Sequence, residues 1–335
     1  MYIPILKNRQ QELKIIKNFQ KCFSERITPM IELIGDYKGT TENTLYDLQE
    51  RLRGKQAFVD FFAFDKDVYK NIDLIKCNLA LEVRTLDKYM DKLSILKQYQ
   101  NIIPVISISN ARNFKNENLK RTLLALKKEH KRISVRITDN YLYEYIEDIE
   151  KVLDERDFFM LDIKQQDIES KLMENMKTKD SDLKARKLIL NSPRHREYQN
   201  GTYKEDGWTS LIDNCVAVKY KEEGYEGYGD YVGLKDALPS KSGRGLGAAL
   251  ALVYLYNNNK FYVSINQNTK DGVSGFKNVI KRLSKLPDSE FEKKDCPMFN
   301  LLYKMIKEGK SGNWASWIYL TMARYIDQVY RHYLL

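Results

Sequence analysis

Two spacings of hydrophobic residues alternate along the first 190 residues. Short β-branched and aromatic runs, typical of buried strands, are followed by stretches in which apolar residues recur every three or four positions, as in amphipathic helices. This alternation predicts repeated strand–helix units around a parallel sheet. The predicted strands span residues 2–6, 27–34, 57–62, 102–108, 133–138, 158–163 and 187–191.

A closed strand–helix barrel needs an eighth strand. Three segments compete for it, at residues 79–83, 215–220 and 228–234, and the pattern does not choose between them. An open doubly wound sheet is the alternative, but no glycine-rich phosphate turn follows an early strand. The sequence therefore predicts an α/β protein with a (β/α)8 TIM-barrel-like domain over residues 1–235.

The pattern changes after residue 192. A polar segment at 193–208 is expected to be a loop, and the runs 248–256 and 261–266 predict a β-hairpin. Helical spacing returns at 276–286, 298–307 and 314–333. We expect residues 236–335 to form a hairpin and helical extension that packs on the barrel in a single compact unit.

Composition limits the classes of function. No apolar run approaches the roughly 18 residues of a membrane span, and no signal-peptide pattern follows the first residues, so we expect a cytoplasmic protein without membrane partners. Four scattered cysteines and three histidines disfavour a zinc site. The net charge of +10 permits binding to nucleic acid, although lysines spread along the chain are equally typical of a solvated surface.

Charged residues interrupt several of the predicted strands near their C-terminal ends: Lys7, Glu32, Asp60, Arg136 and Asp162. A buried charge costs several kcal/mol unless it is paired or used. Charges at one end of successive strands are typical of the mouth of a barrel, where active sites lie. The row therefore predicts a functional mouth.

Two interpretations of this row stay open. In the functional one, Glu32, Asp60 and Asp162 bind Mg²⁺ or Mn²⁺ for phosphodiester hydrolysis or act as acid and base, Lys7 takes part in catalysis, and Arg136 binds an anionic substrate. In the structural one, the acids pair with Lys7 and Arg136 as a buried charge cluster. Any resident cofactor would be a metal ion held by oxygen ligands.

Further candidates follow the later strands. Arg194 and His195 could contact phosphate, or they could belong to a solvated loop. Tyr228, Asp230 and Tyr231 lie in a glycine-rich motif that either recognises substrate or closes the barrel. Aromatic residues at 314–330 predict either core packing or a homo-oligomer interface on the last helix.

Several motifs resemble the phage-type "beta protein" family. They are the opening Met-Tyr-Ile-Pro-Ile-Leu-Lys-Asn-Arg-Gln-Gln-Glu and the segment Ile-Thr-Pro-Met-Ile-Glu-Leu at 27–33. The motif Glu-Gly-Tyr-Gly-Asp-Tyr-Val-Gly-Leu at 226–234 and Ser-Gly-Asn-Trp-Ala-Ser-Trp at 311–317 are similar to a bacterial relative. That relative has Arg-Asn-Ala-Asp-Tyr where this chain has residues 194–198, and a histidine and a serine after the hairpin strand where this chain has residues 264–266.

The resemblance implies a barrel-like α/β protein of undefined activity from phage or bacterial defence-type gene neighbourhoods. It also implies a co-encoded nuclease-type protein as a partner. Two hypotheses follow: a metal-assisted hydrolase of phosphodiesters in a phage–host conflict system, or a non-catalytic subunit that binds nucleic acid or protein and acts with a separate nuclease.

Overall fold

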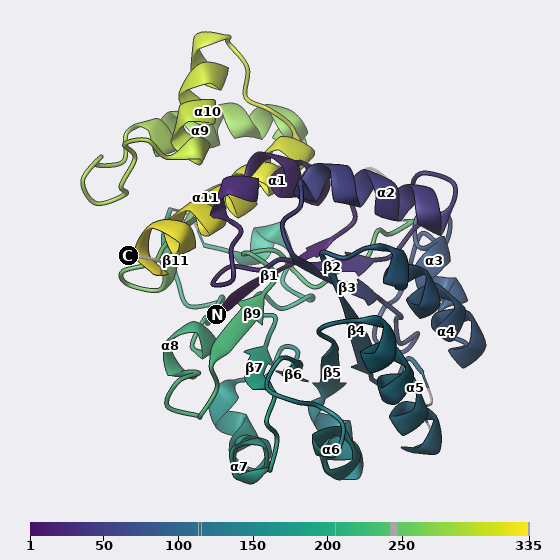
Figure 1. Cartoon of the computed structure of the whole chain (residues 1–335). Helices are drawn as coiled ribbons and strands as arrows, with labels where there is room; N and C mark the ends of the chain where they lie inside the picture. The colour runs from purple at the N-terminus through teal and green to yellow at the C-terminus, as the bar shows by residue number, and fades with distance from the viewer. Residues whose placement is uncertain (113, 115, 205, 242–246, 334–335) are drawn as a thin grey trace.

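The chain folds around a closed barrel of parallel strands (Figure 1). The computed structural model describes residues 1–335 except 113, 115, 205, 242–246 and 334–335. Neighbouring strands follow the order β1-β2-β3-β4-β5-β6-β7-β9, which confirms the predicted (β/α)8-like fold. The barrel strands are β1 Tyr2–Lys7, β2 Met30–Leu33, β3 Ala57–Phe61, β4 Ile102–Ile108, β5 Ser134–Thr138, β6 Phe158–Asp162, β7 Arg186–Leu190 and β9 Gly227–Asp230.

The third candidate segment closes the barrel. Strand β9 pairs in parallel with both β7 and β1. Its glycines permit this fit, because a Cβ atom on Gly229 would lie 2.8 Å from the carbonyl oxygen of Ile3. The other two candidate strands are wrong: they form the helices α3 Asn78–Glu82 and α8 Val216–Lys219, and a short apolar run does not distinguish a strand from one buried face of a helix.

Amphipathic helices surround the barrel, as the spacing of apolar residues predicts. In α2, Leu45 and Leu48 are buried, and the Thr40 side chain caps the first turn by accepting a hydrogen bond from the Asn43 amide. The helices around the barrel are α1 Gln10–Asn18, α2 Thr41–Leu52, α4 Leu86–Ile95, α5 Asn116–Glu129, α6 Leu142–Glu150 and α7 Leu172–Asp180, with 3-10 turns at Gln20–Cys22, Leu96–Gln98, Asp139–Tyr141, Ile168–Lys171 and Asn200–Thr202.

The C-terminal extension contains the predicted hairpin and three helices. Strands β10 Ala249–Leu255 and β11 Lys260–Asn266 pair antiparallel, and β8 Gly207–Thr209 adds a third strand at the end of the segment predicted to be a loop. Helix α11 packs against α1 and β10 between the barrel and the other helices (Figure 1). The remaining elements are the 3-10 turn Thr269–Gly275 and helices α9 Phe276–Ser284, α10 Pro297–Lys307 and α11 Trp314–Tyr333.

Aromatic residues of α11 pack inside the molecule. Tyr325 stacks on Tyr254 with ring centroids 4.3 Å apart, and Trp317 stacks on Phe276 at 5.1 Å. These contacts hold α11 against the hairpin and against α9, as the core-packing interpretation predicts. A homo-oligomer through this helix stays a prediction. Among the described helices, none is both long and apolar enough to cross a membrane.

Candidate functional site

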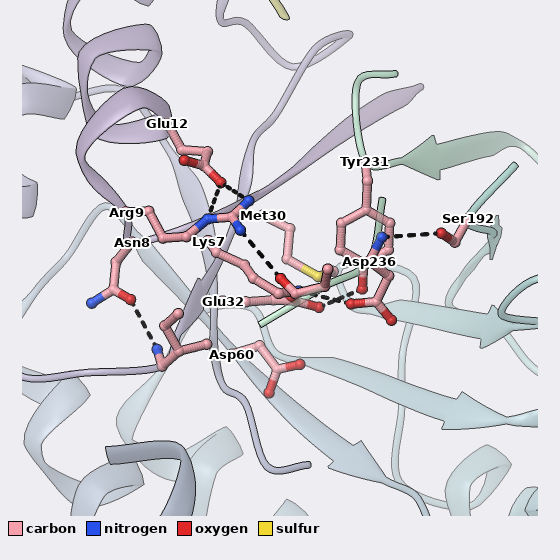
Figure 2. A network of polar contacts seen from close by, with 12 residues as sticks. Lys7, Asn8, Arg9, Glu12, Met30, Glu32, Asp60, Ser192, Tyr231 and Asp236 are labelled. Carbon is pink, nitrogen blue, oxygen red and sulfur yellow. Dashed lines mark hydrogen bonds and ion pairs between the residues drawn. The ribbon is translucent and has the colours of Figure 1, made fainter. Parts of the chain in front are cut away.

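The charged residues of the strand ends meet inside the barrel. Lys7, Glu32 and Asp60 are register partners on the adjacent strands β1, β2 and β3. They point to the same side, because residues paired in register on neighbouring strands face the same side of the sheet. Figure 2 shows Lys7 reaching toward Glu32 and toward Asp236 from the loop after β9. Its Nζ atom contacts Glu32 Oε2 and lies 2.8 Å from Asp236 Oδ1.

Arg136 joins three carboxylates from three strands. Its guanidinium lies 2.7 Å from Glu32 Oε1, 3.0 Å from Asp60 Oδ2 and 2.7 Å from Asp162 Oδ2. All four residues are at most 4% exposed. The ion pairs of the structural interpretation are therefore confirmed. We call Lys7, Glu32, Asp60, Arg136, Asp162 and Asp236 the strand-end network.

These cations keep most of the acids ionised. Burial acts to raise the pKa of Glu32, but Lys7 and Arg136 outweigh it and hold that pKa below its ordinary value. The pKa of Asp162 is lowered in the same way, by Lys164 and Arg136 against burial. For Asp236, Lys7 is the strongest of the cations that overcome burial and lower the pKa.

The same contacts bear on the predicted metal site. Glu32 Oε1 accepts hydrogen bonds from Arg136 and Tyr231, and Asp162 Oδ2 accepts from Arg136 and Lys164. A divalent ion would have to displace these donors, so the arrangement fits a guanidinium better than Mg²⁺ or Mn²⁺. Among the described residues, the side chains close enough to share a metal ion are the group Asp167, Asp213 and Cys215 near the surface. Glu32, Asp60 and Asp162 do not form such a group. Metal binding stays a prediction.

Asp60 differs from the other acids of the strand-end network. Its Oδ2 atom accepts from Ser107 at 2.6 Å and from Arg136, but its buried Oδ1 has no hydrogen-bond partner among the described residues. Asp60 lines a cavity of about 20 Å³ together with Ser107, Arg112, Arg136 and Lys164. A water molecule needs roughly 10–15 Å³, so one water fits this floor cavity.

A larger pocket opens over the C-terminal ends of β3 to β6. It has a volume of about 340 Å³, and it shares Lys164, Phe62 and Thr138 with the floor cavity. Two cationic side chains reach it: Lys164 is 30% exposed and Arg196 is 21% exposed. The residues of this mouth pocket are Phe62, Ala63, Asp65, Val68, Tyr69, Ser109, Asn110, Ala111, Thr138, Asp139, Asn140, Lys164, Gln165, Gln166 and Arg196.

Two loops pair beside the mouth pocket. Ile72 and Ser240 form an antiparallel bridge, and the Tyr69 hydroxyl donates to Asp236 Oδ2 at 2.6 Å. Asp236 also pairs with Lys7, which is 1% exposed. The loop after β9 therefore supplies Asp236 and helps to bury the Lys7 side of the strand-end network.

One residue of the glycine-rich motif contacts the strand-end network. The Tyr231 hydroxyl donates to Glu32 at 2.8 Å. Asp230 instead accepts hydrogen bonds from Tyr2 and from Tyr325 of α11, and Tyr228 packs on Tyr2. The structure thus places the predicted substrate-binding residues Tyr228 and Asp230 on the outside of the barrel, because neighbours in a strand face opposite sides.

In the loop after β7, only some of the basic residues reach the mouth pocket. Arg194 is 9% exposed and bonds to Tyr203, away from the mouth pocket. His195 is half-buried beside Glu197 and stacks on Tyr198. Neither residue lines the mouth pocket, which Arg196 reaches instead. The stretch at 241–247 is basic and rich in glycine, a composition that allows phosphate binding, but it lacks the spacing of a phosphate loop. It lies largely outside the described residues.

Sequence reasoning missed Asp236 and three residues that contact acids of the network, namely Lys164, Ser107 and Tyr69. Lys164 follows Asp162 by two positions, and Ser107 is a polar residue inside an apolar strand. Both could have been found from the sequence, because alternate residues of a strand face the same side. Tyr69 and Asp236 lie on loops without periodicity, so their approach depends on the closed barrel. Only the completed fold reveals them.

A comparison with known protein families shows the family of this chain. The family model described as "Beta protein" matches residues 2–190, more than half of the chain. The chain belongs to the Beta protein family. The match spans β1 to β7 and includes Lys7, Glu32, Asp60, Arg136 and Asp162, but it ends before Asp236, β9 and the extension. No curated protein and no solved structure matches the chain.

Proposed function

We propose that this Beta protein family member is a phosphate-handling hydrolase whose active site is the mouth pocket with its floor cavity. The observation that carries the proposal is the buried Oδ1 atom of Asp60, which has no partner in the described part of the chain. An acceptor of this kind beside a cavity for one water is suited to hold and deprotonate a nucleophilic water.

Cationic residues supply the second half of the proposal. Lys164 and Arg196 line the mouth pocket, and Lys164 also lines the floor cavity. They would hold the phosphate of a phosphodiester or phosphate ester, and Arg136 would position Asp60 while offsetting the charge that develops during attack. The reaction proposed is cleavage of a P–O bond by water, with the water proton passing to Asp60 and the leaving oxygen accepting a proton from solvent.

Bis(p-nitrophenyl) phosphate tests this proposal directly. We expect the purified chain to release p-nitrophenol, and we expect EDTA to leave the rate unchanged, because cations of the protein replace the metal. Loss of the rate in EDTA, with recovery in Mg²⁺ or Mn²⁺, would favour the metal-assisted form that the sequence predicts. The hydrolase proposal would be contradicted if the chain hydrolysed neither this diester nor dinucleotides nor cyclic nucleotides.

A second candidate function is a non-catalytic subunit that binds nucleic acid or a protein partner, such as a co-encoded nuclease. The observation that favours it is the pairing of Glu32, Asp162 and Asp236 with cations, which stabilises a barrel without requiring chemistry. Binding to single-stranded DNA should then weaken steeply with salt and persist in EDTA. The proposed setting of either function, a phage–host conflict system, is supported by the family resemblance alone.

A further inference from the structure

A separate pocket lies between the barrel and the C-terminal extension. Its volume is about 270 Å³, and it contains neither Asp60 nor any other member of the strand-end network. One wall is apolar and includes Leu252 and Ile318 with both tryptophans of α11. The lining also includes the cations Arg9, Arg194 and Lys235, and no described carboxylate lines the pocket. We call it the junction pocket.

Among the described residues, Arg194 has no acidic partner. Its guanidinium donates to the Tyr203 hydroxyl at 3.0 Å, to the Gly233 carbonyl at 3.5 Å and to the Asn200 side-chain oxygen at 3.5 Å, all of them neutral acceptors. The residue is 9% exposed. A buried guanidinium without a counter-ion is costly, whereas the buried cations Lys7 and Arg136 contact carboxylates.

Lys235 adds a second cation to the same pocket. It is half-buried, and its Nζ atom donates to the backbone carbonyl of Arg196 at 3.1 Å. Burial and the nearby Arg194 lower the pKa of Lys235 to about 8, with Glu197 as the opposing charge. An anion between the two side chains would relieve their repulsion and supply the missing counter-charge.

We propose that the junction pocket binds a small amphipathic anion: one carboxylate held by Arg194 and Lys235, attached to an aromatic or aliphatic body that packs against Trp314 and Leu252. The cationic residues of the pocket account for the carboxylate, and its apolar residues account for the aromatic or aliphatic body. This site is independent of hydrolysis at the mouth, because the two pockets share no residue.

Calorimetric titration of the full chain with 4-phenylbutanoate tests this site. We expect binding at least about tenfold tighter than that of 4-phenylbutanamide, which lacks the charge, and of acetate, which lacks the apolar body. Lys235→Met should weaken 4-phenylbutanoate at least about tenfold, since it removes one of two charge-assisted contacts. Lys281→Met, an exposed lysine on α9, and Lys164→Met, at the mouth, should leave the affinity unchanged.

Any one of the following results would overturn the proposal. They are equal binding of the acid and its amide, wild-type affinity in Lys235→Met, and no heat of binding at millimolar 4-phenylbutanoate. Lys235→Met is the decisive variant, because Arg194→Gln removes a buried side chain and could unfold the loop. Loss of binding in Lys164→Met instead would place the anion at the mouth pocket and also reject the junction site.

Discussion

Asp60 and Arg136 define the site at the scale of single residues. Arg136 contacts three carboxylates, and Asp60 keeps one oxygen without a partner among the described residues. The sequence predicts that these side chains converge, because strand parity and parallel register follow from the period of the pattern. It does not predict which oxygen stays unpaired, since that depends on how Arg136 and Ser107 divide their hydrogen bonds.

Removing the guanidinium should destabilise the barrel strongly. Arg136→Gln leaves Glu32, Asp60 and Asp162 without a shared cation in the interior, and a buried ion pair broken on one side costs about 3–5 kcal/mol. Urea unfolding should show a loss of this size. Arg156→Gln is the control, because Arg156 is 63% exposed in its pair with Asp154 and should change stability little. Equal effects of the two substitutions would argue against a buried network.

Asp230 should make stability fall as pH rises. Burial raises its pKa to about 6 from an ordinary 3.8, so the folded chain binds this proton more tightly than the unfolded chain. The free energy of unfolding should therefore decrease between about pH 4 and pH 6 by up to about 3 kcal/mol from this group. Asp230→Asn removes this term. Its stability relative to wild type should be higher at pH 7 than at pH 4, as measured by urea unfolding, and a difference independent of pH would contradict the assignment.

At the scale of elements, β9 is what the sequence could not assign. Three short segments had similar apolar content, and only the tertiary structure distinguishes the strand from helices α3 and α8. The glycines of β9 carried the missing signal, because they mark a close approach of neighbouring backbone. Seven strands came from the pattern because each strand after the first follows a stretch with helical spacing. The eighth follows polar and glycine-rich residues without such a stretch.

Gly229→Ala should test this close packing. The added Cβ would lie 2.8 Å from the Ile3 carbonyl oxygen and 2.7 Å from Leu190 Cδ2. Overpacking of this kind costs about 1–3 kcal/mol, because the backbone of β1 must shift. Gly201→Ala is a matched control, since nothing lies within 4 Å of its Cβ position. Thermal melts should separate the two variants, and equal melting temperatures would show that β9 tolerates a side chain.

At the scale of the whole molecule, one hydrophobic core joins the barrel to the hairpin and α11, and a second lies within the extension. Leu252 and Phe261 of the hairpin and Ile326 of α11 belong to the same buried cluster as Tyr2 of β1. The predicted division at residue 235 therefore separates two parts that bury a common surface. Sequence reasoning found both parts because the spacing changes between them, but contacts across so many residues leave no local pattern.

The shared core predicts cooperative unfolding. The three tryptophans, Trp208, Trp314 and Trp317, lie on β8 and α11, whereas far-ultraviolet circular dichroism reports on the helices and strands of the whole chain. Thermal transitions followed by tryptophan fluorescence and by circular dichroism should coincide, as for a single cooperative unit. An earlier transition in fluorescence would show that the extension unfolds independently of the barrel.

The most direct test of the proposed active site is the rate of bis(p-nitrophenyl) phosphate hydrolysis by Asp60→Asn in EDTA, with the melting temperature measured in parallel. We predict a loss of at least about 100-fold, as expected when a general base is removed, and a melting temperature close to that of the wild type. Asp91→Asn, an exposed residue of α4, should keep the wild-type rate. An unchanged rate in Asp60→Asn would contradict the account, and a large drop in its melting temperature would assign Asp60 to structure alone.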